Sequence, residues 1–303
     1  MGILKESENV VLFEVKTNGM TVEEVLFENN ISGRLFRKLK REKSIFLNGA
    51  NVKRTKKTKK GDIISIVLED EIDNTIPQNI PLDIIYEDYD LLVLNKAANI
   101  VVHPTKSHVD GTISNGVSYY YRNKNIKKKI RFINRLDMDT SGVLILAKNS
   151  FSHQQMALQF QENTVIKKYL AIVEGVVLKD EDIIDLPIGR EEEKSIKKVV
   201  TKDGKRAITK YNVIKRFKDS TLLEVQIYTG RSHQIRVHLN HIGHPIIGDT
   251  LYNKPSDLIK RQALHASQLV AKHPRTNEKI EFNAPLPLDI KNMMKSLKDS
   301  ETI

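Results

Sequence analysis

The segment NRLDMDTSG, residues 134–142, concentrates side chains that can take part in chemistry. Asp137 and Asp139 can act as a general base or as a nucleophile, and Arg135 can bind an anion beside them. The same residue types also form ordinary turns, and an apolar run, VLILAK, follows directly. On composition alone a turn is the simpler interpretation, and we assign that role to the last four residues, Asp139 to Gly142.

Two further segments hold candidate binding groups. In YTGRSHQIR, residues 228–236, a glycine separates a strand-like run from a helix-like run. Arg231 and the free backbone N–H groups of such a helix start form a natural anion-binding position. In Lys167-Lys168-Tyr169 an aromatic ring lies beside two cations. That combination can stack on a base and hold its phosphate, although a tyrosine at a strand start more often packs in a core.

We expect no metal site from the histidines, which are His233, His238, His241, His244 and His265. No two are four residues apart, the spacing that helical zinc ligands prefer. Cysteine is absent, which excludes disulfides, thiolate catalysis and cysteine metal ligands. The chain also lacks a serine elbow motif and a glycine-rich nucleotide loop after a strand. These exclusions leave carboxylate chemistry supported by arginine, without a cofactor.

The positive charge of the chain is concentrated in one short segment. The 303 residues carry a net charge of +11, with 49 Lys and Arg against 38 Asp and Glu. Residues 32–60 hold twelve of the basic residues and one acid, so the remaining chain has 37 of each sign. This distribution predicts a small module that binds a polyanion, attached to a neutral domain. No secretory signal or membrane span is recognisable, so we expect a cytoplasmic protein that does not bind a membrane.

The basic segment predicts a compact fold of helices and strands. Residues 21–52 contain two short helical patterns followed by a strand that ends at Asn48-Gly49, and residues 61–68 form a closing strand. Ser32 is placed to cap the second helix. The polar face of that helix carries four cations, Arg34, Arg37, Lys38 and Arg41.

Residues 13–70 resemble the S-four-like RNA-binding module, named for a small-subunit ribosomal protein. The resemblance rests on Ser32, Arg34, Arg37 and Lys38, then Leu47-Asn48-Gly49, Lys53 and Gly61-Asp62. It implies that RNA is the partner, with Arg41 as a further contact. Such modules accompany several activities, so this one indicates no reaction.

The rest of the chain predicts an α+β domain. Residues 71–83 combine acids, asparagines and prolines, as a linker does. Strand-like runs dominate residues 84–295, and helical patterns occur at 150–163 and 232–242. Because strands outnumber helices and do not alternate with them, we expect a mixed, mainly antiparallel central sheet. A second basic cluster, residues 122–131, is expected to be an exposed loop.

The second domain resembles the pseudouridine synthases of the RluA type, which isomerise uridines in ribosomal RNA and some transfer RNAs. The similarity spans about Ile84 to Ile290. It rests on motifs that occur in order: DLLVLNK with VVHP, RLDMDTSG, KKYLAIVEG, TGRSHQIRVHLNHIGHPIIGDTLY, RQALHASQL and HPRTNEKIEFNAPLP. The fold expected is therefore that of a pseudouridine synthase.

The resemblance also implies roles for individual residues. Asp137 matches the catalytic aspartate, Arg231 the arginine that pairs with it, and Tyr169 the tyrosine that packs on the target base. Arg135 matches an arginine that opens the RNA structure, and we expect Lys96 and Lys168 to contact RNA. The chain departs from the pattern at Asn134, where histidine is usual, and at Ala97 and Asn99, where proline and glycine are frequent.

These observations predict a monomeric, cofactor-free enzyme that acts on large-subunit ribosomal RNA. Three alternatives stay open on the sequence. One is a transfer RNA substrate, one is a non-catalytic RNA-binding or ribosome-assembly factor with the same fold, and one is a metal-dependent RNA hydrolase that uses the histidines.

Overall fold

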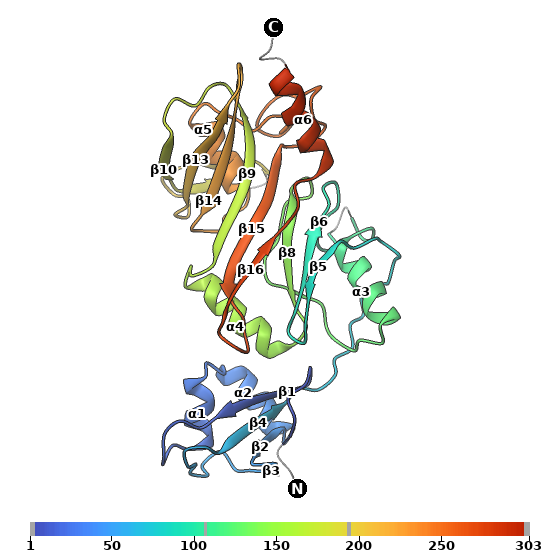
Figure 1. Ribbon diagram of the computed structural model, residues 1–303, viewed down its shortest axis with the longest axis vertical. Helices are drawn as coiled ribbons and strands as arrows, with labels where there is room; N and C mark the ends of the chain where they lie inside the picture. The colour runs from blue at the N-terminus through green and yellow to red at the C-terminus, as the bar shows by residue number, and fades with distance from the viewer. Residues whose placement is uncertain (1–3, 106–107, 193–194, 300–303) are drawn as a thin grey trace.

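The computed structural model describes residues 4–105, 108–192 and 195–299. Figure 1 shows a small N-terminal unit next to a larger unit built on one long sheet. None of the helices in these ranges has the length and apolar character needed to cross a membrane.

The N-terminal unit is a four-stranded antiparallel sheet covered by two helices (Figure 1). Its strands, in spatial order, are β1 (Val10–Glu14), β4 (Ile63–Val67), β2 (Ile45–Leu47) and β3 (Ala50–Asn51). The helices are α1 (Val22–Glu28) and α2 (Gly33–Arg41), as the sequence predicts. Ser32 caps α2 by accepting a hydrogen bond from the Leu35 amide at 3.2 Å. Asn48 and Gly49 both have positive φ, which suits the tight turn between β2 and β3.

The segment between the two units is fastened to the larger one, although residues 68–83 contain no helix or strand. It runs along α3 (Ile113–Asn123), where Asn115 donates to the Ile76 carbonyl and Ser118 donates to the Thr75 carbonyl. These bonds of 2.8 and 2.7 Å restrict the residues that the sequence predicts as a linker.

The larger unit has a mixed, mainly antiparallel sheet, which confirms the expected fold class. The strand order is β10-β13-β14-β9-β15-β8-β6-β5, with β16 paired to β15 and β7 paired to β8. Among the strand pairs of this sheet within the described residues, only β15–β8 is parallel. The strands are β5 (Ile84–Glu87), β6 (Leu91–Lys96), β7 (Arg131–Phe132), β8 (Ser141–Ala147), β9 (Ile166–Glu174), β10 (Glu181–Asp185), β13 (Ile208–Arg216), β14 (Ser220–Ile227), β15 (Leu264–Lys272) and β16 (Lys279–Asn283). A separate hairpin joins β11 (Ile188–Arg190) to β12 (Lys198–Val200).

Helix α3 and three further helices pack around this sheet (Figure 1). The predicted pair is present as α4 (Ser150–Gln161) and α5 (Gln234–His241), whereas α6 (Leu288–Asp299) and α3 were not predicted. The central strand β8 is buried over its whole length, so both faces of the sheet are covered there. The loop that precedes β8 is therefore held from several sides.

Candidate active site

The loop before β8 presents Asp137 next to a close contact between two strands. Gly142 has φ of +115°, and a Cβ atom on it would lie 2.1 Å from the carbonyl oxygen of Ala266 on β15. Glycine is therefore required where β8 and β15 run in parallel. Thr140 and Ser141 are buried, and their hydroxyls bond Gln262 and His265. The turn role assigned from the sequence holds for Asp139 and for Thr140, whose amide donates to the Asp137 carbonyl at 3.1 Å, whereas Ser141 and Gly142 already belong to β8.

Asp137 is paired with Arg236 of α5. The Arg236 Nη1 atom donates to Asp137 Oδ2 at 3.0 Å, while Nε and Nη2 bind both carboxylate oxygens of Asp249 at 2.7 Å. Asp249 is buried, whereas the Asp137 side chain keeps 34% of its surface exposed. Burial opposes the charge of Arg236, but its bonds and proximity to Asp249 and Asp137 raise the pKa of the guanidinium. Arg236 therefore presents a permanent positive charge to an accessible carboxylate.

The expected pairing of Asp137 with Arg231 is wrong in this structure. Arg231 is exposed, and its Nε donates to the backbone carbonyl of Arg206 at 3.0 Å. It precedes α5, whereas Arg236 lies on the buried side of that helix. Arg231 still lines the same cavity.

Strand β9 also contributes to the cavity lining. Lys167 and Tyr169 both line the cavity, since alternate residues of a strand share a face. Burial, together with the charge of Asp137, raises the pKa of Tyr169, which keeps its hydroxyl protonated. Lys168 points to the other face, where its Nζ forms an ion pair with Glu224 at 3.1 Å. The expectation that Lys168 contacts RNA is therefore not supported, and Lys167 is the lysine at the site.

These groups enclose a cavity of about 380 Å³. Its floor and walls add the aromatic rings of Phe132 and Phe160 and the imidazoles of His103 and His233. Burial lowers the pKa of both histidines, which favours their neutral forms. At the rim, Arg135 is exposed and donates to the hydroxyl of Ser232 at 3.0 Å. The result is a concave, partly aromatic site with one carboxylate and several cations.

Known proteins share this arrangement of sequence and fold. The family model described as RNA pseudouridylate synthase matches residues 90–241. The chain belongs to this family. Pseudouridine synthases are isomerases that convert uridine to pseudouridine in RNA, and the matched residues include Asp137, Tyr169 and Arg236.

Individual relatives agree with the family assignment. A Bacillus subtilis protein named uncharacterized RNA pseudouridine synthase YlyB is 40% identical over 276 residues, which cover 89% of this chain and 91% of the relative. The ribosomal large subunit pseudouridine synthase D of Blochmanniella floridana is 40% identical over 75% of this chain and 76% of its own. The solved structure of human RNA pseudouridylate synthase domain containing 1 has a TM-score of 0.59 and 28% identity, and covers 69% of this chain and 85% of that chain.

Lys96 of this synthase is a structural residue, contrary to the expectation that it contacts RNA. It is only 1% exposed, and its Nζ donates to the carbonyls of Ala97, Met138 and Thr140, each at 2.8 Å. Burial lowers the pKa of Lys96, while the carboxylates of Asp139 and Asp137 act in the opposite direction. Lys96 thus ties the end of β6 to the loop that carries the Asp137 carboxylate.

The departures from the family pattern have local explanations. Asn134 donates to the Val143 carbonyl at 3.1 Å and accepts from the Ile145 amide at 2.8 Å, so its amide group closes the loop onto β8. Asn99 has φ of +60°, a conformation that asparagine tolerates better than most residues other than glycine. At Ala97 the backbone carbonyl alone is used, as an acceptor for Lys96.

Several of the basic residues predicted to bind RNA remain exposed on the N-terminal unit. Arg34, Arg37, Arg41 and Lys53 are all exposed. Lys38 is half-buried and forms an ion pair with Glu71 at 3.5 Å.

Two other predicted contacts in this unit serve its fold. The Asn48 amide bonds the Asp62 carboxylate and the Ile63 backbone, at 2.9 and 2.8 Å. Ser32 uses its hydroxyl as the α2 cap. The better candidates for phosphate contacts are therefore the exposed Arg34, Arg37, Arg41 and Lys53.

The expected exposed loop at residues 122–131 is only partly exposed. Lys128 and Arg131 turn inward and pair with Asp70 and Glu71 at the start of the segment between the units, and Lys128 also donates to Asn9 beside β1. The Lys128 side chain is 2% exposed. This part of the second basic cluster therefore joins the two units.

Three histidines distant from the cavity are hydrogen-bonded to protein groups. His238 bonds Thr209 and the Leu186 carbonyl, and His265 bonds Ser141 and the Ala284 carbonyl. His244 bonds the Glu174 carbonyl. These contacts fit the structural interpretation of the histidines.

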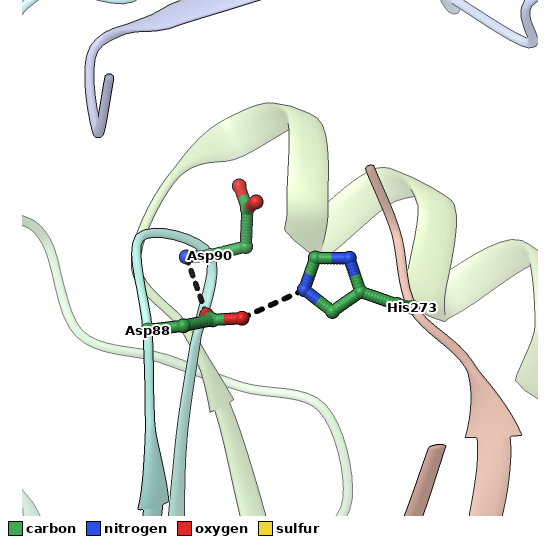
Figure 2. A group of neighbouring side chains, drawn as sticks. All are labelled: Asp88, Asp90 and His273. Carbon is green, nitrogen blue, oxygen red and sulfur yellow. Dashed lines mark hydrogen bonds and ion pairs between the residues drawn. The ribbon is translucent and has the colours of Figure 1, made fainter. Parts of the chain in front are cut away.

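Among the described residues, one group has atoms close enough to share a metal ion: Asp88, Asp90 and His273. Figure 2 shows His273 directed at Asp88, with 2.7 Å between Nε2 and Oδ2. Asp90 instead binds Arg275, at 2.6 Å from Nε to Oδ2. Since these atoms already have protein partners, we assign no metal to the group.

Proposed function

We propose that Asp137 is the catalytic carboxylate of this pseudouridine synthase and that the reaction needs no cofactor. The observation that supports this most is the Asp249–Arg236–Asp137 chain, which fixes an accessible carboxylate in the wall of the cavity. A group held by a buried ion pair is oriented before substrate arrives, which lowers the cost of reaching the reactive geometry.

The reaction breaks the bond between N1 of uracil and C1′ of ribose and joins C5 to C1′. The base gives up the proton on C5 and N1 gains one, so there is no net oxidation and no external group is transferred. A carboxylate can promote this by attacking the sugar, by attacking the base, or by removing a sugar proton. Each of these roles requires Asp137 beside the glycosidic bond.

Tyr169, Phe132 and Phe160 provide apolar and aromatic surfaces for the target base. A uridine in a helix cannot reach this cavity, so it must be extruded or already unpaired, at a cost of a few kcal/mol. Stacking on an aromatic side chain contributes about 1–3 kcal/mol per base. Arg135 at the rim is placed to occupy the gap that the base leaves.

We further propose large-subunit ribosomal RNA as the substrate and residues 13–70 as an S-four-like docking module. Relatives named ribosomal large subunit pseudouridine synthase D support the first point. The concentration of positive charge at residues 32–60, with Arg34 and Arg37 exposed, supports the second. A ribosomal substrate agrees with the cytoplasmic location expected from the sequence.

The catalytic role is tested by Asp137→Asn, with Asp139→Asn as a matched control in the same loop. We expect Asp137→Asn to abolish pseudouridine formation while RNA affinity changes little, because the amide keeps the shape and loses the charge. Asp139→Asn should retain turnover. Wild-type rates in Asp137→Asn would refute the role, and a non-catalytic factor would form no pseudouridine in any variant.

The substrate is tested by mapping pseudouridine in RNA from cells with and without the protein. Sites lost from large-subunit ribosomal RNA would support the proposal. Loss confined to transfer RNA would replace it with the alternative substrate.

A further inference from the structure

Helix α4 connects the N-terminal unit to the catalytic cavity. Near its start, Phe151 is buried in the hydrophobic core of the N-terminal unit, where its ring meets Phe13 edge-on with 5.9 Å between centroids. Near its end, Phe160 lines the cavity. At a rise of about 1.5 Å per residue, these positions are roughly 14 Å apart along one rigid helix.

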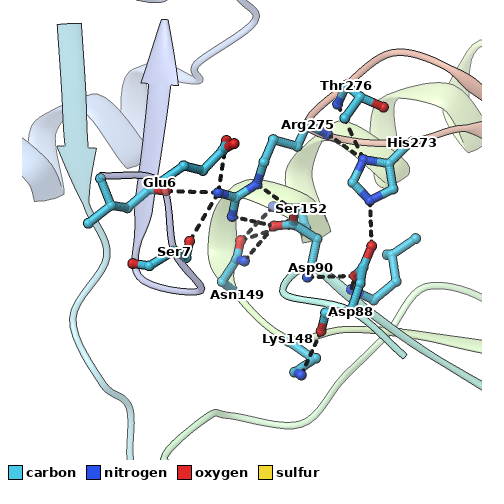
Figure 3. Close-up of polar contacts among 12 residues, drawn as sticks. Glu6, Ser7, Asp88, Asp90, Lys148, Asn149, Ser152, His273, Arg275 and Thr276 are labelled. Atoms are coloured by element: carbon cyan, nitrogen blue, oxygen red, sulfur yellow. Dashed lines mark hydrogen bonds and ion pairs between the residues drawn. The ribbon is translucent and has the colours of Figure 1, made fainter. Parts of the chain in front are cut away.

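Arg275, in the turn between β15 and β16, binds both units at once (Figure 3). Its Nε and Nη2 atoms bind the two oxygens of Asp90, at 2.6 and 3.1 Å. Its Nη1 atom donates to Glu6 Oε1 at 3.1 Å and to the carbonyls of Ser7 and Val10 at 3.0 and 2.8 Å. The side chain is only 7% exposed, so these bonds are shielded from water.

The catalytic-domain end of this connection is held firmly. Asp90 accepts from Asn149 at 2.8 Å and from Ser152 at 2.5 Å, both at the start of α4 (Figure 3). Next to it, His273 binds Asp88 (Figure 2). The cluster with the spacing of metal ligands thus acts as the anchor for Arg275.

A second set of contacts lies along α4. Gln154 accepts from the Ser32 amide at 3.0 Å and donates to the Asn30 carbonyl. Gln155 donates to the Asn29 carbonyl at 3.1 Å. These bonds hold the loop that enters α2, the helix that carries Arg34 and Arg37.

We infer that Arg275 and the α4 contacts hold the basic face of α2 at a fixed separation from the cavity, which makes Arg275 a positioning residue for substrate choice. An RNA then gains both sets of contacts only if its phosphates and its target uridine have the matching separation. The inference rests on the proposed RNA-docking role of the N-terminal unit. It adds that the unit selects RNAs by geometry as well as by charge.

A fixed connection also has a thermodynamic consequence. A module on a free linker must be ordered when a second contact forms, and that ordering weakens the combined affinity. In this chain the ordering is already present before RNA binds. We therefore expect loss of the connection to weaken binding of long RNAs and to leave short ones unaffected.

The test compares two RNAs that carry the same target uridine. One is a long structured RNA that can reach both units, and the other is a short stem-loop that fills only the cavity. The variants are Arg275→Lys, which keeps a charge beside Asp90 but cannot make all five bonds, and Gln154→Ala/Gln155→Ala, which alters only polar contacts at the surface of α4. We expect KM for the long RNA to rise at least about tenfold, with kcat retained and both constants unchanged on the stem-loop.

A further arm combines each variant with Arg34→Gln/Arg37→Gln in the full chain. If the connection acts through Arg34 and Arg37, adding Arg275→Lys to the Arg34→Gln/Arg37→Gln protein should not raise its KM further. Equal losses on both RNAs, or additive losses in the combined variants, would overturn the inference and leave Arg275 with a role in stability alone. If the wild-type protein forms pseudouridine in neither RNA, that result would instead refute the proposed function.

Discussion

Arg236 and Arg231 are five residues apart, yet they have different environments. Arg236 is buried and joins Asp137 to Asp249, whereas Arg231 is exposed at the rim of the cavity. Both line the cavity that contains Asp137. The difference between them is geometric, since only Arg236 is fixed by several hydrogen bonds.

Substitution by lysine separates the two arginines. Arg236→Lys should lower kcat/KM about 100-fold, because a single ammonium cannot bind both oxygens of Asp249 and still reach Asp137. Arg231→Lys should cost less than about tenfold, because its charge at the rim is retained. Steady-state kinetics on one RNA substrate measures both. The opposite ranking would return Arg231 to the role first expected of it.

The sequence identified Asp137, Tyr169 and the two exposed arginines of the cavity but not its ion pair. Asp137 and Tyr169 were found because their motifs resemble a known family, and their side chains line the cavity. Arg236 was missed, although it lies between the apolar residues Ile235 and Val237, where a charged residue needs a partner if it is buried. The sequence favoured Lys168 over Lys167. Neighbouring residues of a strand point to opposite faces of the sheet, and two adjacent lysines do not show which of them points toward the cavity.

At the scale of elements, the contact between β8 and β15 fixes the loop that carries Asp137. Gly142→Ala should lower the free energy of unfolding by about 2 kcal/mol or more, because the added Cβ would overlap the Ala266 carbonyl at a φ unsuited to alanine. Gly230→Ala is the control, because a Cβ atom added at Gly230 would have no neighbouring atom within 4 Å. Chemical denaturation measures both, and equal stabilities would contradict the steric argument.

The hairpins β5–β6 and β15–β16 are joined by a pH-sensitive contact. Burial opposes the charge of Asp88, but hydrogen bonds from His273, Tyr86 and two backbone amides lower the pKa of its carboxyl below the ordinary value. The stability from this group is therefore present above about pH 4 and is lost as the pH falls below it.

Asp88→Asn should thus lower the free energy of unfolding by about 1–2 kcal/mol at neutral pH, and the difference from wild type should shrink below pH 4. Asp257→Asn, at a fully exposed side chain, is the control and should have little effect at any pH. Thermal unfolding from pH 3 to 7 measures both. A difference that stays constant across this range would exclude the carboxylate as its source.

Strand β14 shows its period in the sequence, whereas helix α3 does not. The strand β14 alternates buried Leu223, Val225 and Ile227 with less buried neighbours, as expected. Helix α3 has the sequence ISNGVSYYYRN, in which several residues have low helix propensity. A capping box at Thr112 and burial of most of its residues stabilise it instead, and neither is visible as a helical period.

At the scale of the whole molecule, the uneven charge predicts how RNA binding responds to salt. Arg34→Gln/Arg37→Gln should reduce the slope of log K against log salt by roughly 1.4–1.8, because each lost phosphate contact removes about 0.7–0.9. Lys179→Gln/Lys260→Gln is the control, since both lysines are exposed and paired with acids in the catalytic domain. Filter binding from 50 to 300 mM salt measures the slopes, and identical slopes in all three proteins would argue against docking through α2.

The packing of Phe151 in the N-terminal core matters for the order in which the chain is made. Residues 10–67, which form the sheet and helices of that unit, leave the ribosome well before Phe151 is synthesised. The nascent unit therefore lacks one of its buried side chains while the segment that follows is translated. Phe151, which belongs to the larger domain, completes the core of the N-terminal unit. The last step in folding the N-terminal unit is therefore also the step that joins it to the larger domain.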